Sequence, residues 1–456
     1  MTNTIDEDND TMLTDLYQLT MNVAYKEHQK DGTATFDYFI RSLPNDWGFF
    51  VACGIEDVID YATNIRFTDN DITQLNTLPE FRGKNLSWMR DFHFTGEIYA
   101  VNEGTPISHN TPIMRVTAPR MEAQLIESRL LNIANYQTLV ATKAHRVVQA
   151  AAGDPVSDFG LRRGHERDAA MKCAYATYIA GTVGTSNVKA GLKYGIPIKG
   201  THAHSFVMSF PSEIDAFRAY AETFPDNTTL LIDTYDPIQG ARNAAIVAKE
   251  LKQKNKRLLA VRIDSGDLTR VSKDVRAVLD EQGQTDVNII ATNDLNEYKI
   301  ADLKENAAAI NGYGVGTEMI TARPVAALSG VYKLVEDSLG GKLKLSPGKR
   351  SYPGKKQVYR VVDKDGVYQH DILALENEII KTPFHLVPLL RPAVIKGVRV
   401  EQRKSAGEYR QHALNDISYM PSHTKILKVT QPYKTHVSNG LENLTSELAA
   451  RHCGGS

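Results

Sequence analysis

The sequence predicts an α/β protein built around a β/α barrel, and three observations lead to this fold class. Between residues 153 and 330, short apolar runs alternate with segments of helical periodicity. The runs are apolar almost without interruption, which is typical of parallel strands covered on both faces. About six or seven such units, each of roughly 25–40 residues, suit an irregular barrel whose chemistry lies at the carboxyl ends of its strands. An open, doubly wound sheet is the alternative.

Length and composition limit the class of protein. The chain has 456 residues, enough for two or three packed domains. Hydrophobic residues make up 42% of the chain and charged residues 23%, as in ordinary globular proteins. The net charge is −1 without a basic or acidic block, so we expect neither a nucleic-acid partner nor a membrane surface. All apolar stretches are far shorter than the roughly 20 residues of a membrane span.

The first residues and the cysteines indicate a compartment. The chain begins with an acidic stretch that lacks the apolar core of a signal peptide. Cys53, Cys173 and Cys453 lack CxxC spacing, which argues against a zinc ribbon and against a disulfide framework. We therefore expect a cytoplasmic enzyme.

Residues 1–120 predict a small α+β domain. Apolar residues at helical spacing predict a first helix from Asp10 or Thr11 to about Gln29. Tyr17 lies on this helix, where a core aromatic is the simplest interpretation. Further patterns predict a helix at 49–62 and strands at 35–41, 97–101 and 112–116.

Residues 121–330 contain the predicted barrel. The strongest helical pattern, 122–152, comes first and carries one broad apolar stripe. Apolar runs predict strands at 156–159, 196–199, 230–232, 258–263, 287–291 and 310–315. Helical periodicity between the runs predicts helices at 168–180, 213–223, 238–254, 272–281 and 297–306.

Residues 331–456 form a C-terminal segment that is rich in predicted strands up to residue 436. Gly-Gly, Pro-Gly and Asp-Gly turns separate these strands. We expect the segment to pack on the N-terminal domain or to form a third domain. Its basic turn, 342–356, has two interpretations, a solvated loop, which we prefer, and an anion clamp.

Two histidines follow the predicted strand 196–199. His202 and His204 are two positions apart, so in an extended chain they point to the same side. A histidine at such a position is a candidate nucleophile, general base or metal ligand. The plain alternative is a pair of hydrogen-bonded surface histidines.

Reactive groups follow the other predicted strands as well. Gly314 and Gly316, with Thr317, are suited to cradle a phosphate through their backbone N–H groups. Arg162 and Arg262 offer fork-shaped donors that match a carboxylate or a phosphate.

Carboxylates and one aromatic ring complete the set. Asp264, Asp267 and Asp294 are candidates to hold Mg²⁺ through one or two carboxylates and substrate oxygens. Phe159 is suited to stack on a flat ring. Together these residues predict a site for a phosphorylated sugar and a planar aromatic acid.

A zinc-dependent hydrolase is the competing interpretation of the two histidines. Amidohydrolases of this kind also begin their metal site with HxH at a barrel strand end, but they need further histidines at later strand ends. This chain has no histidine between His204 and His370. The metal-hydrolase alternative is therefore disfavoured.

Six short motifs, taken in order, resemble the nicotinate phosphoribosyltransferase family. The resemblance implies a type II phosphoribosyltransferase, with an irregular α/β barrel and an α+β domain built from both chain ends. It also implies an obligate homodimer whose site lies between subunits. The motifs occupy residues 14–21, 159–163, 181–187, 200–205, 262–267 and 314–317.

The resemblance assigns roles around the nicotinate ring. Tyr17 would come from the partner subunit and sandwich the ring against Phe159, while Thr201 and Arg262 match nicotinate contacts. His204 matches the histidine that ATP phosphorylates during turnover, and His202 receives no role.

The remaining matches concern the sugar and the metal. Arg162, Gly314, Gly316 and Thr317 match groups near the phosphate and phosphoribosyl end. Asp233 and Asp264 match acidic residues near the ring, the ribose and the Mg²⁺ ion, and we expect Asp233 to orient the His204 imidazole. Some relatives carry a C-terminal cysteine cluster that binds zinc, which this chain lacks.

The implied reaction is an ATP-coupled transfer in NAD salvage. The 5-phosphoribosyl group of 5-phosphoribosyl 1-diphosphate passes to nicotinate, and nicotinate mononucleotide and diphosphate are formed. The related nicotinamide enzyme carries an aspartate where Ser186 stands, and a carboxylate there would repel an acid. Ser186 therefore favours nicotinate. Nicotinamide as substrate and a non-catalytic binding protein on the same barrel stay as alternatives.

Overall fold

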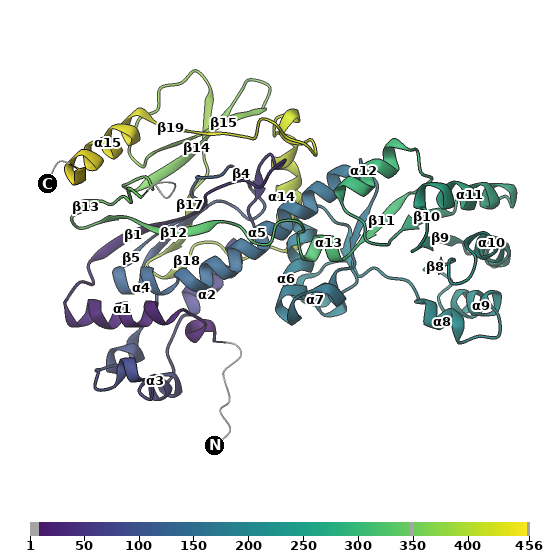
Figure 1. Cartoon of the computed structure of the whole chain (residues 1–456), viewed down its shortest axis with the longest axis horizontal. Helices are drawn as coiled ribbons and strands as arrows, with labels where there is room; N and C mark the ends of the chain where they lie inside the picture. The colour runs from purple at the N-terminus through teal and green to yellow at the C-terminus, as the bar shows by residue number, and fades with distance from the viewer. Residues whose placement is uncertain (1–8, 347–350, 454–456) are drawn as a thin grey trace. The chain divides into compact units, whose positions relative to one another are not determined.

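The computed structural model describes residues 9–346 and 351–453. The chain divides into two compact units (Figure 1). The first consists of Met1–Leu139, Ala327–Lys404 and Gln411–Ser456, and the second of Val140–Ala326 and Ser405–Arg410. The first unit confirms the predicted α+β domain built from both chain ends.

The first unit contains two larger sheets and a short one, among the residues described. The order of the seven-stranded sheet is β13 (Gly340–Gly341), β12 (Gly330–Asp337), β1 (Thr33–Ile40), β5 (Met114–Pro119), β3 (Glu97–Ala100), β17 (Arg391–Ile395) and β18 (Val398–Arg399). The order of the four-stranded sheet is β16 (His385–Pro388), β14 (Lys356–Val362), β15 (Tyr368–Leu375) and β19 (Thr435–Val437). The short sheet pairs β2 (Phe50–Val51) with β4 (Pro106–Ile107).

The α-helices of the first unit are α1 (Leu16–Glu27), α2 (Ile55–Asn64), α3 (Asp69–Leu75), α4 (Arg120–Leu125) and α15 (Asn439–Cys453). Two further helices, α5 (Glu127–Ala150) and α14 (Ala406–Ser418), contain residues of both units. Single 3₁₀ turns are η1 (Asp10–Met12), η2 (Pro79–Phe81), η3 (Ser87–Asp91) and η5 (Ser422–Thr424).

Two helices begin later than the sequence predicted. The predicted first helix is interrupted because Leu13 leaves the helical conformation, and α1 starts only after the extended Asp15. The predicted helix at 49–62 starts at Ile55, since Phe50 and Val51 pair with β4 and Gly54 has a positive φ of 90°.

The second unit is built on a parallel sheet of six strands within the described residues. Their order is β7 (Gly184–Thr185), β6 (Val156–Asp158), β11 (Gly312–Val315), β10 (Asn288–Ala291), β9 (Leu258–Ile263) and β8 (Thr228–Leu231). The helices are α6 (Glu166–Ile179), α7 (Val188–Tyr194), α8 (His204–Met208), α9 (Glu213–Thr223), α10 (Pro237–Gln253), α11 (Leu268–Glu281), α12 (Glu297–Glu305) and α13 (Thr317–Ile320), with the 3₁₀ turn η4 (Leu161–Arg163).

The two edges of this sheet are linked by one short segment. Ile198 forms a single parallel bridge with Thr185 of the edge strand β7. Four residues later, the Nε2 of His202 accepts a hydrogen bond from Leu231 N of β8, the opposite edge, at 3.2 Å. The sheet therefore curls into an incomplete, irregular barrel, as predicted, rather than staying open and doubly wound. The predicted strand at 196–199 is reduced to this bridge because Ile198 is 45% exposed and gains little from burial.

The basic turn at 342–356 is only partly a solvated loop. Lys356 is buried, and its ammonium group pairs with Asp37 at 2.9 Å and donates to the carbonyls of Tyr352 and Gly354. Lys342 pairs with Asp337 at 3.1 Å. Residues 347–350 of the turn lie outside the described residues.

Among the helices described, none combines the length and the apolar character that spanning a bilayer requires.

Candidate active site

The loops after the parallel strands place most of the predicted site residues in the second unit. Several polar residues in these loops cap the helix that follows, by accepting hydrogen bonds from its first backbone N–H groups. Asp236 and Asp267 act in this way at α10 and α11. For these two residues the structural role is the primary one. Further caps of this kind are Asn187 at α7 and Asn296 at α12.

A buried carboxylate organises the start of the site. Asp158, at the end of β6, accepts hydrogen bonds from the Thr185 hydroxyl at 2.7 Å and from Gly160 N at 2.9 Å. Burial raises the pKa of this carboxyl group. Asp158 therefore fixes β7 and the Phe159 loop relative to β6. Sequence reasoning did not assign it to the site, although its position at a strand end was a usable signal.

The two glycines at the end of β11 make room for Phe159. A Cβ atom on Gly314 would lie 2.6 Å from the Cδ2 and Cε2 atoms of the Phe159 ring. A Cβ on Gly316 would lie 2.9 Å from the Phe159 carbonyl oxygen. The backbone also joins the two segments, since Phe159 N donates to Val315 O at 2.8 Å. The glycines therefore set the position of the ring, a role that their sequence pattern did not reveal.

The His204 imidazole is held from two sides. His204 begins α8, and its Nδ1 lies 3.1 Å from the hydroxyl oxygen of Thr234. Its Nε2 faces the Oδ2 of Asp264 at 3.8 Å. The side chain is 42% exposed, so a ligand can reach it. We had expected Asp233 to orient this ring. That expectation is wrong, since Thr234 and Asp264 occupy the two sides.

Asp233 instead supports the neighbouring loop. One of its oxygens accepts from Asp264 N at 2.7 Å and from the Ser265 hydroxyl at 2.6 Å. Its other oxygen, Oδ1, is buried and has no hydrogen-bond partner among the described residues. Asp233 thus holds the Asp264 backbone in place and retains one free acceptor.

Arg262 brings a positive charge to the same place. Its Nη1 donates to the Thr201 hydroxyl at 2.7 Å, and its Nη2 lies 3.7 Å from the Asp264 carboxylate. The side chain is only 14% exposed, and burial is the main cause that lowers the pKa of this guanidinium. The positive charge of Arg162 lowers that pKa further. Arg162 itself lies on η4 and is exposed.

His202 does not share the environment of His204. Its ring is buried against aromatic side chains, with a centroid distance of 4.9 Å to Tyr220. Burial lowers the pKa of this imidazole to about 4. The prediction that the two histidines face the same side is wrong because the chain leaves the extended conformation where α8 begins.

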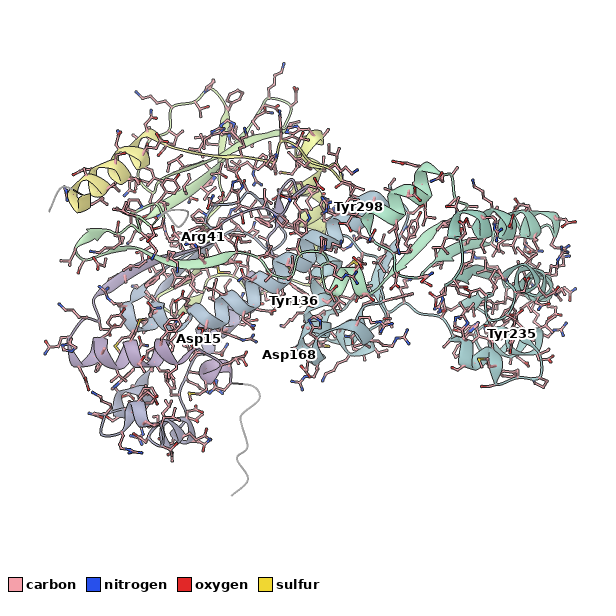
Figure 2. The ribbon with its side chains drawn as sticks, in the orientation of Figure 1. Asp15, Arg41, Tyr136, Asp168, Tyr235 and Tyr298 are labelled. Carbon is pink, nitrogen blue, oxygen red and sulfur yellow. The ribbon has the colours of Figure 1, made fainter. Side chains whose placement is uncertain are left out.

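The other predicted residues are less constrained. Ser186 N donates to Asp158 O at 2.9 Å, and the side chain is half-buried. Asp294 is exposed and follows Asn293 in a left-handed turn, with φ values of 46° and 91°. Tyr17 lies on α1 in the first unit and is 46% exposed. Tyr235, which the sequence analysis did not single out, is labelled in Figure 2; it lies in the loop after β8 and is 67% exposed.

Among the described residues, no group of three or more His, Cys, Asp or Glu side chains is arranged to hold a metal ion. The side chains of Asp264, His204 and Arg262 form a carboxylate–imidazole–guanidinium cluster.

Comparisons with known proteins find similar chains in a single family. Residues 12–135 match the model of the nicotinate phosphoribosyltransferase (NAPRTase) N-terminal domain, and residues 155–344 match that of the NAPRTase family. A nicotinate phosphoribosyltransferase of Mycobacterium tuberculosis is 41% identical over 440 residues, covering 96% of this chain and 93% of the relative. One from Bacillus subtilis is 39% identical over 461 residues, with coverages of 95% and 94%.

Solved structures show the same fold. The crystal structure of human nicotinic acid phosphoribosyltransferase has a TM-score of 0.83 at 27% identity, covering 95% of this chain and 99% of that one. A nicotinate-nucleotide pyrophosphorylase from Pyrococcus furiosus has a TM-score of 0.74 at 24% identity, covering 91% and 98%.

Proposed function

This chain belongs to the nicotinate phosphoribosyltransferase family and is an enzyme of NAD salvage, and we propose that it couples phosphoribosyl transfer to ATP through phosphorylation of His204. The observation that carries the proposal is the placement of His204 between Thr234 and Asp264, beside Arg262. The zinc-hydrolase and binding-protein alternatives are set aside by the family assignment.

The proposed acceptor site holds nicotinate by charge and by stacking. The guanidinium of Arg262, fixed by Thr201, supplies donors for the carboxylate of the substrate. The Phe159 ring, seated against Gly314, supplies a flat apolar face for the pyridine. The pyridine nitrogen then attacks C1 of 5-phosphoribosyl 1-diphosphate, the C1–O bond breaks, and diphosphate leaves with the electron pair. Fixing both reactants in line removes much of the entropic barrier.

The phosphate groups have cationic and backbone donors nearby. Arg162 is exposed and makes no ion pair within the described residues, so its guanidinium group is available to the substrate phosphates. We propose that Gly314, Gly316 and Thr317 contact the phosphoribosyl end. The same two glycines leave room for Phe159, the proposed stacking partner of nicotinate. In this proposal the glycine turn therefore positions both substrates.

His204 is the proposed phosphoryl acceptor. In the tautomer whose Nδ1–H donates to Thr234, the Nε2 atom carries the lone pair and attacks the γ-phosphorus of ATP. The bond from that phosphorus to the bridging oxygen breaks, and ADP leaves. Asp264, 3.8 Å from Nε2, stabilises the positive charge that forms on the ring. Water later hydrolyses the phosphohistidine and releases phosphate, which draws the overall reaction forward.

The carboxylates suit Mg²⁺ bound mainly through substrate oxygens. Asp264 is 32% exposed, and Asp233 keeps one buried oxygen without a partner. Asp267 uses one oxygen as a helix cap and Asp294 is exposed, so each retains an acceptor. Mg²⁺ takes one or two carboxylates beside phosphate oxygens, and when bound it neutralises the diphosphate. We propose Asp264 as its first ligand, with Asp267 and Asp294 as candidates for the second.

We further propose a homodimer that completes the site. Large apolar side chains at the start of the first unit are exposed: Leu13 by 56%, and Leu16 and Tyr17 by 46% each. A second copy that covers this face would bring Tyr17 against the nicotinate ring, opposite the partner's Phe159. Such burial of exposed apolar surface is typical of stable homodimers.

A product assay tests the proposed function. The purified chain is incubated with 5-phosphoribosyl 1-diphosphate and either nicotinate or nicotinamide, with and without ATP. We expect nicotinate mononucleotide as the main product and one ATP hydrolysed per product. A rate and an equilibrium yield that do not change when ATP is omitted would contradict the coupling.

A further inference from the structure

A hollow in the first unit is not used by the reaction above. Its inner part is a cavity of about 220 Å³ lined by residues of β1, the loop before β5, the start of β14 with the segment before it, and β15. A second cavity of about 300 Å³ shares Asn110, Tyr352 and Leu373 with the first. The two therefore adjoin each other, and together they have the size of an ordinary small-ligand site, about 300–1,000 Å³.

The inner end presents an unsatisfied carboxylate oxygen. Lys356 donates to Asp37 at 2.9 Å and to the carbonyls of Tyr352 and Gly354, which uses all three of its N–H groups. Asp37 is 1% exposed, and its Oδ1 atom has no hydrogen-bond partner among the described residues. Because an unpaired buried acceptor is costly, this end of the hollow is suited to a ligand that donates an N–H group.

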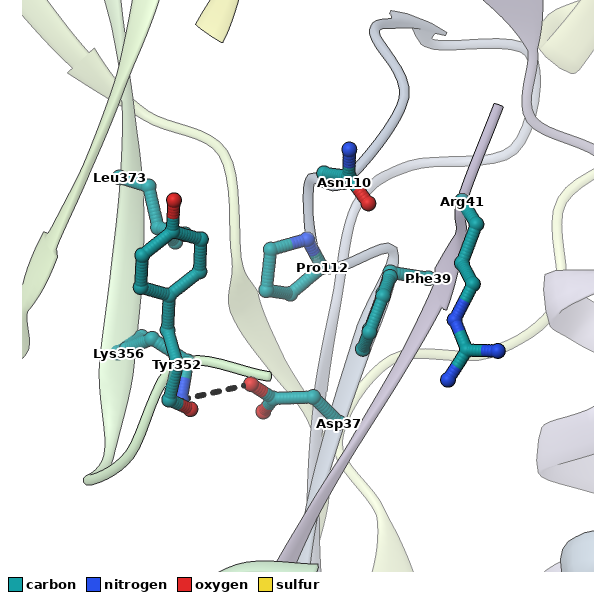
Figure 3. A pocket seen from close by; sticks show the side chains of 8 residues that line it. All are labelled: Asp37, Phe39, Arg41, Asn110, Pro112, Tyr352, Lys356 and Leu373. Atoms are coloured by element: carbon teal, nitrogen blue, oxygen red, sulfur yellow. Dashed lines mark hydrogen bonds and ion pairs between the residues drawn. The ribbon is translucent and has the colours of Figure 1, made fainter. Parts of the chain in front are cut away.

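The side walls offer flat apolar faces, while Arg41 and Asn110 add polar groups to the lining. Figure 3 shows Tyr352 and Leu373 on one side and Phe39 and Pro112 on the other, with the Asp37 carboxyl group between them at one end. Aromatic and proline faces separated in this way suit a planar ring. The ring of the ligand would lie here with its donor toward Asp37.

The outer end carries positive charge. Lys434, His436 and His109 line the second cavity, and Lys434 and His436 are exposed. Burial lowers the pKa of His109, so Lys434 supplies the main permanent charge. An anionic group on the ligand would be held at this end.

We propose that this hollow is a binding site for a mononucleotide with an amino-bearing heterocycle, separate from the catalytic barrel. The ring amino group pairs with Asp37, the heterocycle lies between Tyr352 and Pro112, and the phosphate lies at Lys434. Inorganic phosphate alone leaves Asp37 unpaired, and a nucleoside alone leaves Lys434 unused. Both ends of the hollow are needed for tight binding.

Calorimetry on the full chain with adenosine 5′-monophosphate as the probe tests this site. Saturating 5-phosphoribosyl 1-diphosphate is present to occupy the catalytic barrel. We expect one probe molecule per chain to remain bound, and adenosine and inorganic phosphate each to bind more weakly. If the sugar substrate displaces all of the probe, or phosphate alone binds as tightly, the proposal is wrong.

Matched surface variants locate the binding. Lys434→Glu changes an exposed lysine of the outer cavity, so folding is preserved, and we expect binding about tenfold weaker. Lys364→Glu makes the same charge change on an exposed turn of the same unit and should leave binding unchanged. Both variants should keep wild-type transferase activity without the probe. Equal probe affinity in the two variants would overturn the assignment.

Discussion

The hydroxyl oxygen of Thr234 lies 3.1 Å from the Nδ1 atom of His204. This contact fixes which imidazole nitrogen is engaged by the protein and which one faces the substrate side, where Asp264 lies 3.8 Å from Nε2. The tautomer of a histidine is set by the hydrogen bond that its other nitrogen makes. Thr234 is therefore the positioning residue of the proposed phosphoryl acceptor.

Removal of the Thr234 hydroxyl should uncouple the two reactions. Thr234→Val keeps the shape of the side chain but frees the Nδ1 atom. We expect ATP hydrolysis per turnover to fall about tenfold or more, with the KM for nicotinate nearly unchanged. Thr234→Ser restores the hydroxyl and should restore coupling. A valine variant with wild-type ATP stoichiometry would show that the contact is only structural.

Ser186 should set the choice between acid and amide. Ser186→Asp places a carboxylate beside the proposed ring site, where it repels nicotinate and accepts from the amide of nicotinamide. We expect kcat/KM for nicotinate to fall by about 10²-fold or more and the preference to move toward nicotinamide. Ser186→Ala controls for loss of the hydroxyl alone. An unchanged ratio of the two kcat/KM values would remove Ser186 from the site.

Gly314→Ala should displace the Phe159 ring. The added Cβ would lie 2.6 Å from two ring atoms and 2.8 Å from Thr292 Cγ2, closer than packed atoms approach. We expect the KM for nicotinate to rise about tenfold through lost stacking. Gly312→Ala on the same strand is the matched control, since its Cβ would meet the nearest atom at 3.4 Å. Equal KM values in the two variants would argue against a stacking role for Phe159.

Acid should destabilise the barrel unit through His202. The pKa of this imidazole is lowered by burial from 6.5 to about 4. Between these two pH values, His202 is mostly protonated in the unfolded chain and mostly neutral in the folded chain. The free energy of unfolding therefore does not depend on His202 protonation above pH 6.5. As the pH falls from 6.5 to about 4, it decreases by about 3 kcal/mol at most.

His202→Gln isolates this effect, because glutamine keeps an acceptor for Leu231 N but does not titrate. Urea unfolding of both proteins at several pH values between 7 and 4 gives the difference in the free energy of unfolding. We expect the wild type to lose more stability than the variant across this range. Parallel curves would mean that His202 is not buried in the neutral form.

Much of the barrel could be predicted from local pattern. Strands such as β8 and β11 are buried on both faces, and β9 nearly so, which made their apolar runs visible; β9 was placed correctly at both ends. The run at 196–199 failed because Ile198 is exposed, and a single sequence does not reveal exposure.

The sequence predicted which residues gather at the site but not which of them contact one another. His204, Asp264 and Arg262 gather as expected, because parallel strands end at one edge of the sheet. The partner of the imidazole was assigned to Asp233 and is Thr234, since one step along a loop reverses the direction of a side chain. The packing of Phe159 against Gly314 joins residues far apart in sequence, and no local pattern encodes such a contact.

The most direct test of the central claim is transfer of the γ-phosphate of ATP to His204. The chain is incubated with γ-³²P-labelled ATP, quenched in alkali to preserve phosphohistidine, and mapped by peptide mass spectrometry. We predict acid-labile label on the peptide that contains His204, and its loss in His204→Ala, which should keep weak ATP-independent transfer. Label that persists in this variant, or wild-type turnover with the peptide unlabelled, would contradict the account.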